Sequence, residues 1–204
     1  MITYEEQLNR DVRWALQEGS MHFEKTSAVH QSLARIARRL DEIHVPYVIV
    51  GGMALFFHGL RRFTEDVDIL VTQEDLKTVH DRLEGLGYVP PYQGSKHLRD
   101  AESGVRIEFL TTGDYPGDGK EKPVAFPNPR DVAVVLDGIR FLSLPKLIEL
   151  KLASGMSNLK RGQDLIDVQR LIEELGLPEA FVEQLNPYVQ DKFRELWAIA
   201  QMPG

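Results

Sequence analysis

Residues 47–71 constrain the fold more strongly than any other part of the chain. They begin with a β-branched and aromatic run over 47–50, which is typical of a buried strand. Gly51 and Gly52 follow, and residues 53–59 then have helical composition. Because glycine lets the backbone turn sharply and approach other groups closely, the pattern predicts a strand, a tight turn and a short helix.

A second strand is predicted over 66–72, and it carries two aspartates with one residue between them. Side chains alternate across a strand, so Asp66 and Asp68 point the same way, roughly 6.6 Å apart, while Glu65 and Val67 face the other side. Two anions held together on an apolar strand repel each other unless a cation or a basic side chain neutralises them. Carboxylate oxygens of this kind suit Mg²⁺ or Mn²⁺.

The glycine pair strengthens this interpretation. At a turn from strand to helix, the backbone of Gly51 and Gly52 can approach a ligand, and the amides that open the helix favour a phosphate. A glycine pair alone is usually only a turn. Together with the two aspartates, it predicts a phosphate cradle beside a metal site.

A third acidic ligand is expected from the strand predicted over 104–111. Glu108 lies there in an apolar context like that of Asp68, and Arg106 shares its face. If this strand lies beside the strand of Asp66 and Asp68, the three carboxylates could hold one or two metal ions about 3.5 to 4 Å apart. Arg106 would then meet a phosphate or pair with the acids. The alternative for Glu108 is an exposed position on an edge strand.

The pattern along the chain predicts an α/β (α+β) fold, a small mixed β-sheet flanked by N-terminal and C-terminal helices. We expect an N-terminal helical segment over 1–44, a core over 45–142 and a C-terminal helical region over 143–204. The expected helices are 4–19, 25–43, 53–59, 74–85, 145–154, 160–175, 178–186 and 188–201, and the expected strands are 47–50, 66–72, 97–101, 104–111, 132–136 and 139–142. Residues 155–158 are expected to separate the helices 145–154 and 160–175, and the loop over 112–129 is expected to be a lid or a mobile connection.

Composition limits the classes of partner and compartment. A net charge of −7 argues against broad attachment to nucleic acid or anionic lipid, and we interpret Arg35, Arg38 and Arg39 as a solvated helix face. With no cysteine, any metal must be bound by carboxylates or histidine. The first ten residues lack a basic and an apolar signal region, and the apolar stretch 47–60 is too short for a bilayer. We expect a cytoplasmic protein without membrane contact.

Two readings stay open for the C-terminal charges. Asp164 and Asp167 lie three residues apart, on one helix face, and Lys151 belongs to the preceding helix. Lys151 could reach triphosphate oxygens as a point charge while Asp164 positions it. Equally, Lys151 could form an internal ion pair between the two helices.

These motifs together resemble a known superfamily. The pattern of Gly51-Gly52 followed by Arg62-Phe-Thr-Glu-Asp-Val-Asp68 resembles the nucleotidyltransferases that include DNA polymerase beta. Leu147-Ile-Glu-Leu-Lys151 and Arg161-Gly-Gln-Asp-Leu-Ile-Asp167 resemble most closely the AbiEii/AbiGii toxin-like branch. The resemblance covers about residues 45–172, and it departs from the branch at Gln163, where lysine is usual.

The resemblance implies a set of roles, residue by residue. It implies catalysis and metal binding by Asp66, Asp68 and Glu108, phosphate contact by Gly51 and Gly52, and nucleotide or triphosphate contact by Lys151 and Asp164, with Arg62 and Thr64 lining the site. It also implies transfer of a nucleoside monophosphate (NMP) from a nucleoside triphosphate (NTP) to a hydroxyl group, with Mg²⁺ or Mn²⁺ as cofactor and Glu108 accepting the proton of the acceptor.

Three functions compete at this stage. The first is a nucleotidyltransferase acting on tRNA or on a protein hydroxyl, as the toxin of a toxin–antitoxin pair with a cognate antitoxin. The second is an enzyme that modifies a small hydroxylated molecule such as an antibiotic. The third is a non-catalytic nucleotide-binding module, for which Gln163 is the only indication.

Overall fold

A seven-stranded mixed sheet forms the centre of the molecule in the computed structural model, which describes residues 2–202. Its strand order is β3-β4-β5-β2-β1-β7-β6; β2 pairs in parallel with β5, β1 in parallel with β7, and the other neighbours are antiparallel. The strands are β1 (Val48–Ile49), β2 (Asp66–Val71), β3 (Tyr88–Val89), β4 (Leu98–Asp100), β5 (Arg106–Thr111), β6 (Ala133–Leu136) and β7 (Ile139–Leu142).

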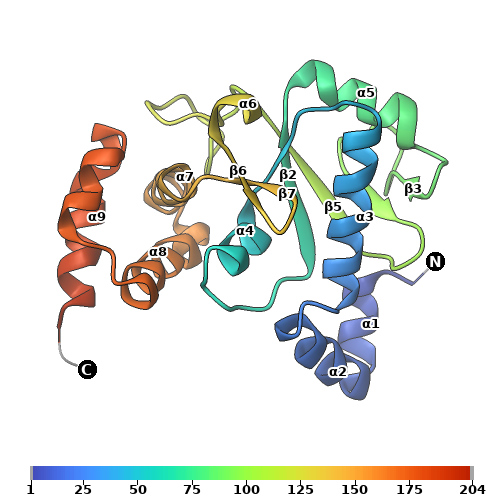
Figure 1. Ribbon diagram of the computed structural model, residues 1–204, viewed down its shortest axis with the longest axis horizontal. Coiled ribbons are helices and arrows are strands. Elements are labelled where there is room, and N and C mark those ends of the chain that lie inside the picture. The colour runs from blue at the N-terminus through green and yellow to red at the C-terminus, as the bar shows by residue number, and fades with distance from the viewer. Residues whose placement is uncertain (1, 203–204) are drawn as a thin grey trace.

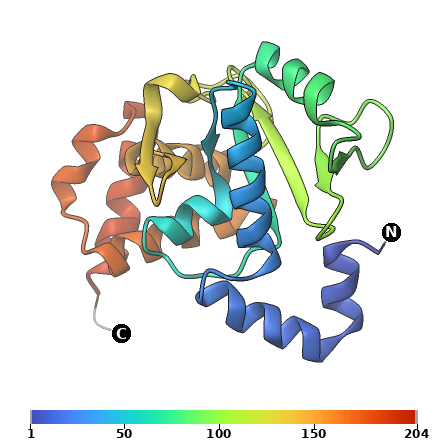
Figure 2. The same cartoon turned by 45° about the vertical axis from the view of Figure 1, so that its right-hand side comes forward.

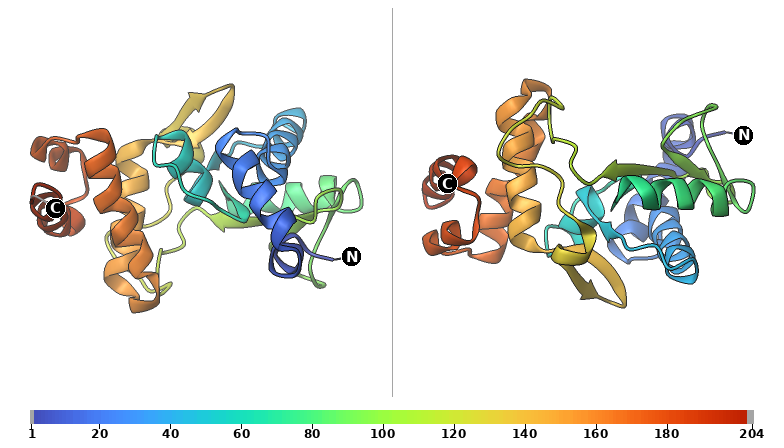
Figure 3. Two further views of the ribbon diagram at one scale, coloured as in Figure 1. Left: turned by 90° about the horizontal axis from the view of Figure 1, so that it is seen from below. Right: turned by 90° about the horizontal axis from the view of Figure 1, so that it is seen from above.

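Helices cover this sheet from both ends of the molecule. Figure 1 shows α7, α8 and α9 at one end of the long axis and α1, α3 and α5 towards the other, and the views from below and above agree (Figure 3). The helices are α1 (Tyr4–Arg10), α2 (Val12–Phe23), α3 (Ala28–Glu42), α4 (Gly51–Phe57), α5 (Gln73–Leu83), α6 (Pro129–Val132), α7 (Leu144–Ser157), α8 (Gly162–Leu175) and α9 (Pro187–Ala200), with 3-10 turns η1 (Leu159–Arg161) and η2 (Glu179–Gln184). The predicted mixed sheet flanked by helices is confirmed.

Alternation in the central strands determines where polar groups lie. Along β5 the side chains alternate between half-buried and buried, so that Ile107 and Phe109 enter the core while Arg106 and Glu108 face out. In β2, Val67 is likewise buried between the two half-buried aspartates. The apolar faces join one core cluster, which leaves the polar faces of both strands free to form a site.

The N-terminal helices differ from the single helix predicted over 4–19. Asp11 ends α1 and caps α2, because its side chain accepts a hydrogen bond from the Trp14 amide. The two helices form a V beside the N-terminus, well apart from α7–α9 (Figure 2). Tyr4 anchors α1: its ring is buried, its amide donates to the Gly104 carbonyl, and its hydroxyl donates to Glu18.

The C-terminal helices correct a second prediction. Residues 155–158 do not break a helix at Gly155, since α7 continues to Ser157. A Cβ at Gly155 would lie 2.6 Å from Leu165 Cγ, so this glycine allows α8 to pack closely against α7. Asn158 ends α7 and leads into η1.

Smaller differences follow from contacts distant in sequence. Strand β3 was not predicted, and residues 179–184 form a 3-10 turn in place of the expected helix over 178–186. Arg35 is not part of a solvated face, because it forms an ion pair with the buried Asp100 at 2.7 Å, whereas Arg38 is exposed as expected. None of the helices within residues 2–202 is long and apolar enough to cross a membrane.

Candidate active site

Three carboxylates meet where β2 and β5 lie side by side. The parallel register pairs Asp66 with Arg106 and Asp68 with Glu108, so the sheet brings Glu108 next to Asp68 as expected. One oxygen from each of Asp66, Asp68 and Glu108 lies within 4.8 Å of the others, and all three residues are half-buried. This set of hard oxygen ligands fits a divalent cation such as Mg²⁺ or Mn²⁺.

The glycine pair makes room for side chains of this site. Gly51 has φ of +60°, and a Cβ there would lie 1.8 Å from Asp68 Oδ2. At Gly52 a Cβ would lie 2.5 Å from Thr64 Oγ1. Both positions therefore require glycine, because the start of α4 lies directly against Asp68 and Thr64.

Gly51→Ala is expected to lower the free energy of unfolding by about 2 to 4 kcal/mol, since left-handed backbone strain adds to the clash with Asp68. Urea unfolding of the two proteins measures this difference. Gly162→Ala serves as the control, because Gly162 opens α8 without positive φ and with no atom within 4 Å of its Cβ position. Equal stability of Gly51→Ala and Gly162→Ala would contradict the assigned packing.

Thr64 and Arg106 hold the acids from two sides. The buried Thr64 donates from its hydroxyl to Asp66 Oδ1 at 3.0 Å. The Arg106 guanidinium contacts Asp66 Oδ2 at 2.9 Å and Glu108 Oε1 at 3.0 Å. Of the two roles considered for Arg106 in the sequence, pairing with the acids is the one that the structure displays.

The charges within the cluster raise the pKa of two groups, which disfavours the charged form of Asp68 and favours the charged form of Arg106. Burial, with the charges of Asp66 and Glu108, raises the pKa of Asp68 to about 7. Burial alone would lower the pKa of Arg106, but the surrounding carboxylates outweigh it and raise that pKa. The cluster therefore holds more negative charge than its surroundings neutralise, which favours a bound cation.

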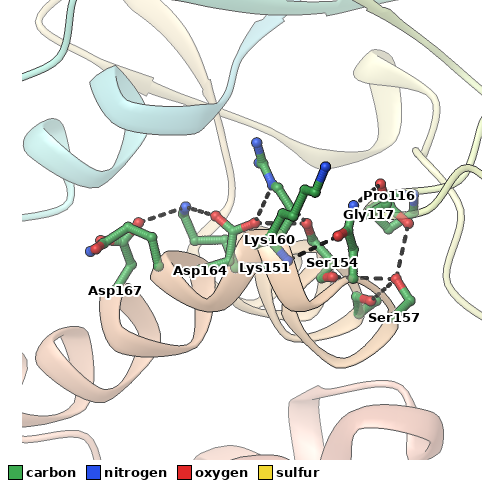
Figure 4. A network of polar contacts seen from close by, with 12 residues as sticks. Pro116, Gly117, Lys151, Ser154, Ser157, Lys160, Asp164 and Asp167 are labelled. Carbon is green, nitrogen blue, oxygen red and sulfur yellow. Dashed lines mark hydrogen bonds and ion pairs between the residues drawn. The ribbon is translucent and has the colours of Figure 1, made fainter.

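Lys151 is the centre of a second charged cluster, between α7 and α8 (Figure 4). Its ammonium group donates to Asp164 Oδ1 and to Asp167 Oδ2, each at 2.8 Å, and all three side chains are at least 92% buried. Ser154 also donates to Asp164, at 2.7 Å. Burial alone would raise the pKa of Asp164, but Lys151 and Ser154 outweigh burial and keep this pKa below its ordinary value. Lys151 thus forms internal ion pairs with two aspartates, and it also lines the cavity described below.

Arg62 and Gln163 extend this cluster towards the acids. Gln163 donates to Asp167 Oδ1 at 3.0 Å, and Arg62 Nε lies 3.5 Å from the same oxygen. Asp167 is fully buried, and it accepts hydrogen bonds from Lys151 and Gln163 beside the longer ion pair with Arg62. Gln163, the departure from the AbiEii/AbiGii pattern, therefore takes part in the cluster as a hydrogen-bond donor.

Both clusters open into one cavity of about 570 Å³. Every residue assigned to the site from the sequence lines it: Gly51, Gly52, Arg62, Thr64, Asp66, Asp68, Glu108, Lys151 and Asp164. Lys160 and Arg161 add exposed cations at one side, and Leu110, Tyr115, Phe126, Leu147 and Leu150 form an apolar wall. The cavity thus combines acids, cations and an apolar surface.

The loop over 112–128 builds part of this wall and is fastened to α7. Asn158 donates from its amide to the Gly117 carbonyl at 3.2 Å, and Ser157 donates to the Pro116 carbonyl at 3.4 Å (Figure 4). The Lys122 ammonium also donates to the Pro116 carbonyl, at 2.8 Å. These contacts favour a fixed wall over the lid considered from the sequence.

Sequence reasoning missed several residues of the site. Asp167 was visible through its spacing from Asp164 but was not assigned to the site, and Arg161 was seen only as part of a motif. Tyr115 and Phe126 lie in a segment read as a loop, without any signal for the cavity. The contact of Glu5 with Arg106, 3.7 Å between carboxylate oxygen and Nε, comes from a helix that no motif connects to the site.

A family model described as an uncharacterised nucleotidyltransferase matches residues 2–150. This match includes the three acids and Arg106 and ends directly before Lys151. It does not extend to the AbiEii/AbiGii branch, which stays a prediction. No curated protein matches the chain.

One solved structure supports the fold, and two others are similar to the chain at lower TM-scores. An antigenic nucleotidyltransferase-like protein from Paracoccidioides brasiliensis has a TM-score of 0.51 at 18% identity, over 83% of this chain and 85% of that chain. A candidate nucleotidyltransferase from Thermotoga maritima has a TM-score of 0.49 at 18% identity, over 67% and 89%. The ANT(2'')-Ia complex with adenylyl-2''-tobramycin has a TM-score of 0.42 at 14% identity, over 84% and 95%.

Proposed function

The chain belongs to the nucleotidyltransferase family whose model matches residues 2–150, and we propose that it transfers an NMP from an NTP to a hydroxyl acceptor, releasing pyrophosphate. The observation that carries this proposal is the meeting of Asp66, Asp68 and Glu108 on two adjacent parallel strands, facing a cavity that also holds cations. Three acids brought this close repel one another, and a bound divalent cation would relieve that repulsion.

The acids are the proposed cation ligands. Mg²⁺ or Mn²⁺ bound there would neutralise phosphate charge and lower the pKa of the acceptor hydroxyl. Thr64 fixes the position of Asp66 through its hydrogen bond, and Asp68 lies against Gly51, so the protein supplies the ligand geometry in advance.

The acceptor oxygen attacks the α-phosphorus, and the bond from that phosphorus to the bridging oxygen breaks, so that pyrophosphate leaves with the electron pair. We assign Glu108 to take the acceptor proton, because its carboxylate reaches the same cavity beside Asp68. This carboxylate is half-buried, which keeps it accessible to an acceptor from solvent.

The cations that line the cavity are the proposed contacts of the triphosphate. Lys160 is exposed, and Arg161 is 58% exposed at its side chain while its Nε pairs with Asp164 at 2.9 Å; we propose that Lys160 and the terminal nitrogens of Arg161 contact phosphate oxygens. Lys151 is held by two aspartates, and we propose that it contributes positive charge beneath the phosphates from a fixed position. The backbone of Gly51 and Gly52 faces the same space.

The apolar wall suits the nucleobase. Tyr115 and Phe126 supply aromatic surface, and Leu147 and Leu150 supply aliphatic surface from α7, in the cavity that also holds the acids. Aromatic faces accept any base by stacking. A tRNA or protein acceptor and a toxin role with a cognate antitoxin stay predictions that rest on the resemblance seen in the sequence.

Thermal unfolding with each of the four NTPs, with and without Mg²⁺ or Mn²⁺, tests the proposed site. An NTP at ~100 times its dissociation constant adds about 2.7 kcal/mol to the free energy of unfolding, which raises the melting temperature by several degrees in a chain of this size. We expect a metal-dependent shift in wild type, and we expect Asp68→Ala to lose it.

Asp81→Ala is the matched control, because Asp81 is an exposed aspartate of α5, 59% accessible and paired with Lys77 outside the cavity. It should keep the full shift. If no NTP shifts the wild type in any metal, the non-catalytic module becomes the better description. If Asp81→Ala loses the shift as Asp68→Ala does, the binding does not occur at the acids.

A further inference from the structure

Arg106 joins the catalytic acids to the N-terminal helix α1. Its two terminal nitrogens contact Asp66 at 2.9 Å and Glu108 at 3.0 Å, and its Nε lies 3.7 Å from Glu5 Oε1. That Nε is buried and has no hydrogen-bond partner within residues 2–202. The guanidinium therefore faces acids on two sides but is hydrogen-bonded on only one.

Glu5 is held firmly in this position by a second arginine. Arg99 donates to Glu5 Oε2 at 2.8 Å, and the β4–β5 register places Arg99 directly opposite Arg106. Two like charges at opposed positions of adjacent strands repel each other, and Glu5 lies between them as a shared counter-ion. The anchored Tyr4 next to it fixes α1 against the end of β5.

Arg106 and a divalent cation would compete for the same carboxylates. Arg106 contacts Asp66 and Glu108, which are two of the three acids that could hold a cation. If the guanidinium left both acids with no other partner, it would lose two ion pairs at a partly buried position. Because Glu5 already lies beside Nε of Arg106, it can replace part of the lost pairing.

The geometry points to a counter-ion exchange. In the metal-free protein, Arg106 pairs with Asp66 and Glu108; when a divalent cation binds these acids, the guanidinium of Arg106 moves to pair with Glu5. Glu5 is then a positioning residue for Arg106, and the N-terminal helix is a functional part of the site. This inference rests on the proposed function, because it requires that the three acids bind a cation.

Mn²⁺ titration by calorimetry, without nucleotide, tests the exchange. Arg106→Gln removes the competitor and should bind Mn²⁺ about tenfold more tightly, as expected when two partly exposed ion pairs no longer have to break. Glu5→Gln leaves Arg106 without its second acidic partner. This variant should bind Mn²⁺ more weakly than wild type, by a factor of about three or more.

The double variant separates this role from simple support of α1. In the Arg106→Gln background, Glu5→Gln should have no further effect on Mn²⁺ affinity, because the guanidinium with which Glu5 would pair is absent. Glu24→Gln is the charge control, since it removes one exposed acid from the same N-terminal region without contact to Arg106 and should match wild type. Melting temperatures of all variants verify folding.

Two results would overturn the exchange. Weaker Mn²⁺ binding by Arg106→Gln would show that Arg106 supports the cation, and an equal loss from Glu5→Gln with and without Arg106 would show that Glu5 acts only on α1. Failure of the proposed function gives a different pattern, because then neither wild type nor any variant binds Mn²⁺.

Discussion

Asp68→Asn is expected to abolish nucleotide transfer while leaving the metal-free protein as stable as wild type or more stable. Transfer should fall by at least about 1000-fold, because the variant loses a charged ligand at the centre of the site. Stability should not fall, since the substitution removes a carboxylate whose ionisation is opposed by burial and by Asp66 and Glu108. Pyrophosphate release and urea unfolding in a chelator measure the two effects.

Adding metal should reverse the order of stability. At ~100 times its dissociation constant, a cation adds about 2.7 kcal/mol to wild type, and Asp68→Asn should gain much less. Asp81→Asn, on the exposed face of α5, should behave as wild type in both assays. A clear loss of stability for Asp68→Asn in the chelator would instead identify Asp68 as a structural residue.

Lys151→Met is expected to cause the largest loss of stability, about 3 to 5 kcal/mol near neutral pH, because it leaves Asp164 and Asp167 buried without their shared cation. Lys77→Met, in an exposed ion pair with Asp81, should cause no measurable change. Replacing all three partners, Lys151→Met with Asp164→Asn and Asp167→Asn, should recover most of the loss. Urea unfolding of the four proteins makes the comparison.

The pH dependence gives an independent check on Lys151→Met. In wild type the pKa of Asp164 is held below its unfolded value, so its contribution to stability is present at neutral pH and is lost as pH falls through the folded pKa. Without Lys151 the largest favourable charge on this carboxylate is gone, and only Ser154 and Arg161 continue to lower its pKa. The gap in stability between wild type and Lys151→Met should therefore narrow as pH falls below about 4, through the range where aspartates take up protons. A constant gap would mean that lost packing, not charge, explains the effect.

Local patterns predicted the acids, while their neighbours depended on the tertiary structure. Alternation alone placed Asp66 and Asp68 on one face, and an apolar context like that of Asp68 indicated Glu108. The parallel β2–β5 register that joins them involves strands with α5, β3 and β4 between them in the chain. Sequence pattern could propose that pairing but could not derive it.

The wrong predictions share a physical cause, since one residue type can serve two purposes. Gly155 was predicted to belong to the break between two helices, but α7 continues through it, and it permits close contact with Leu165. Residues 4–19 were predicted to form one helix, whereas the side chain of Asp11 caps a second helix within that range. Glu5 had no local signal at all, because its role depends on Arg99 and Arg106 at the edge of a distant strand pair.

The family model matches one wall of the cavity but not the other. The sheet wall, with Asp66, Asp68, Glu108 and Arg106, lies within the region that matches the family, whereas Lys151 and all of α8 lie beyond residue 150. The acids are fixed by strand pairing and do not depend on side chains of α8 for their register. Substitutions on α8 can therefore change the lining of the cavity while the three acids on the sheet keep their places.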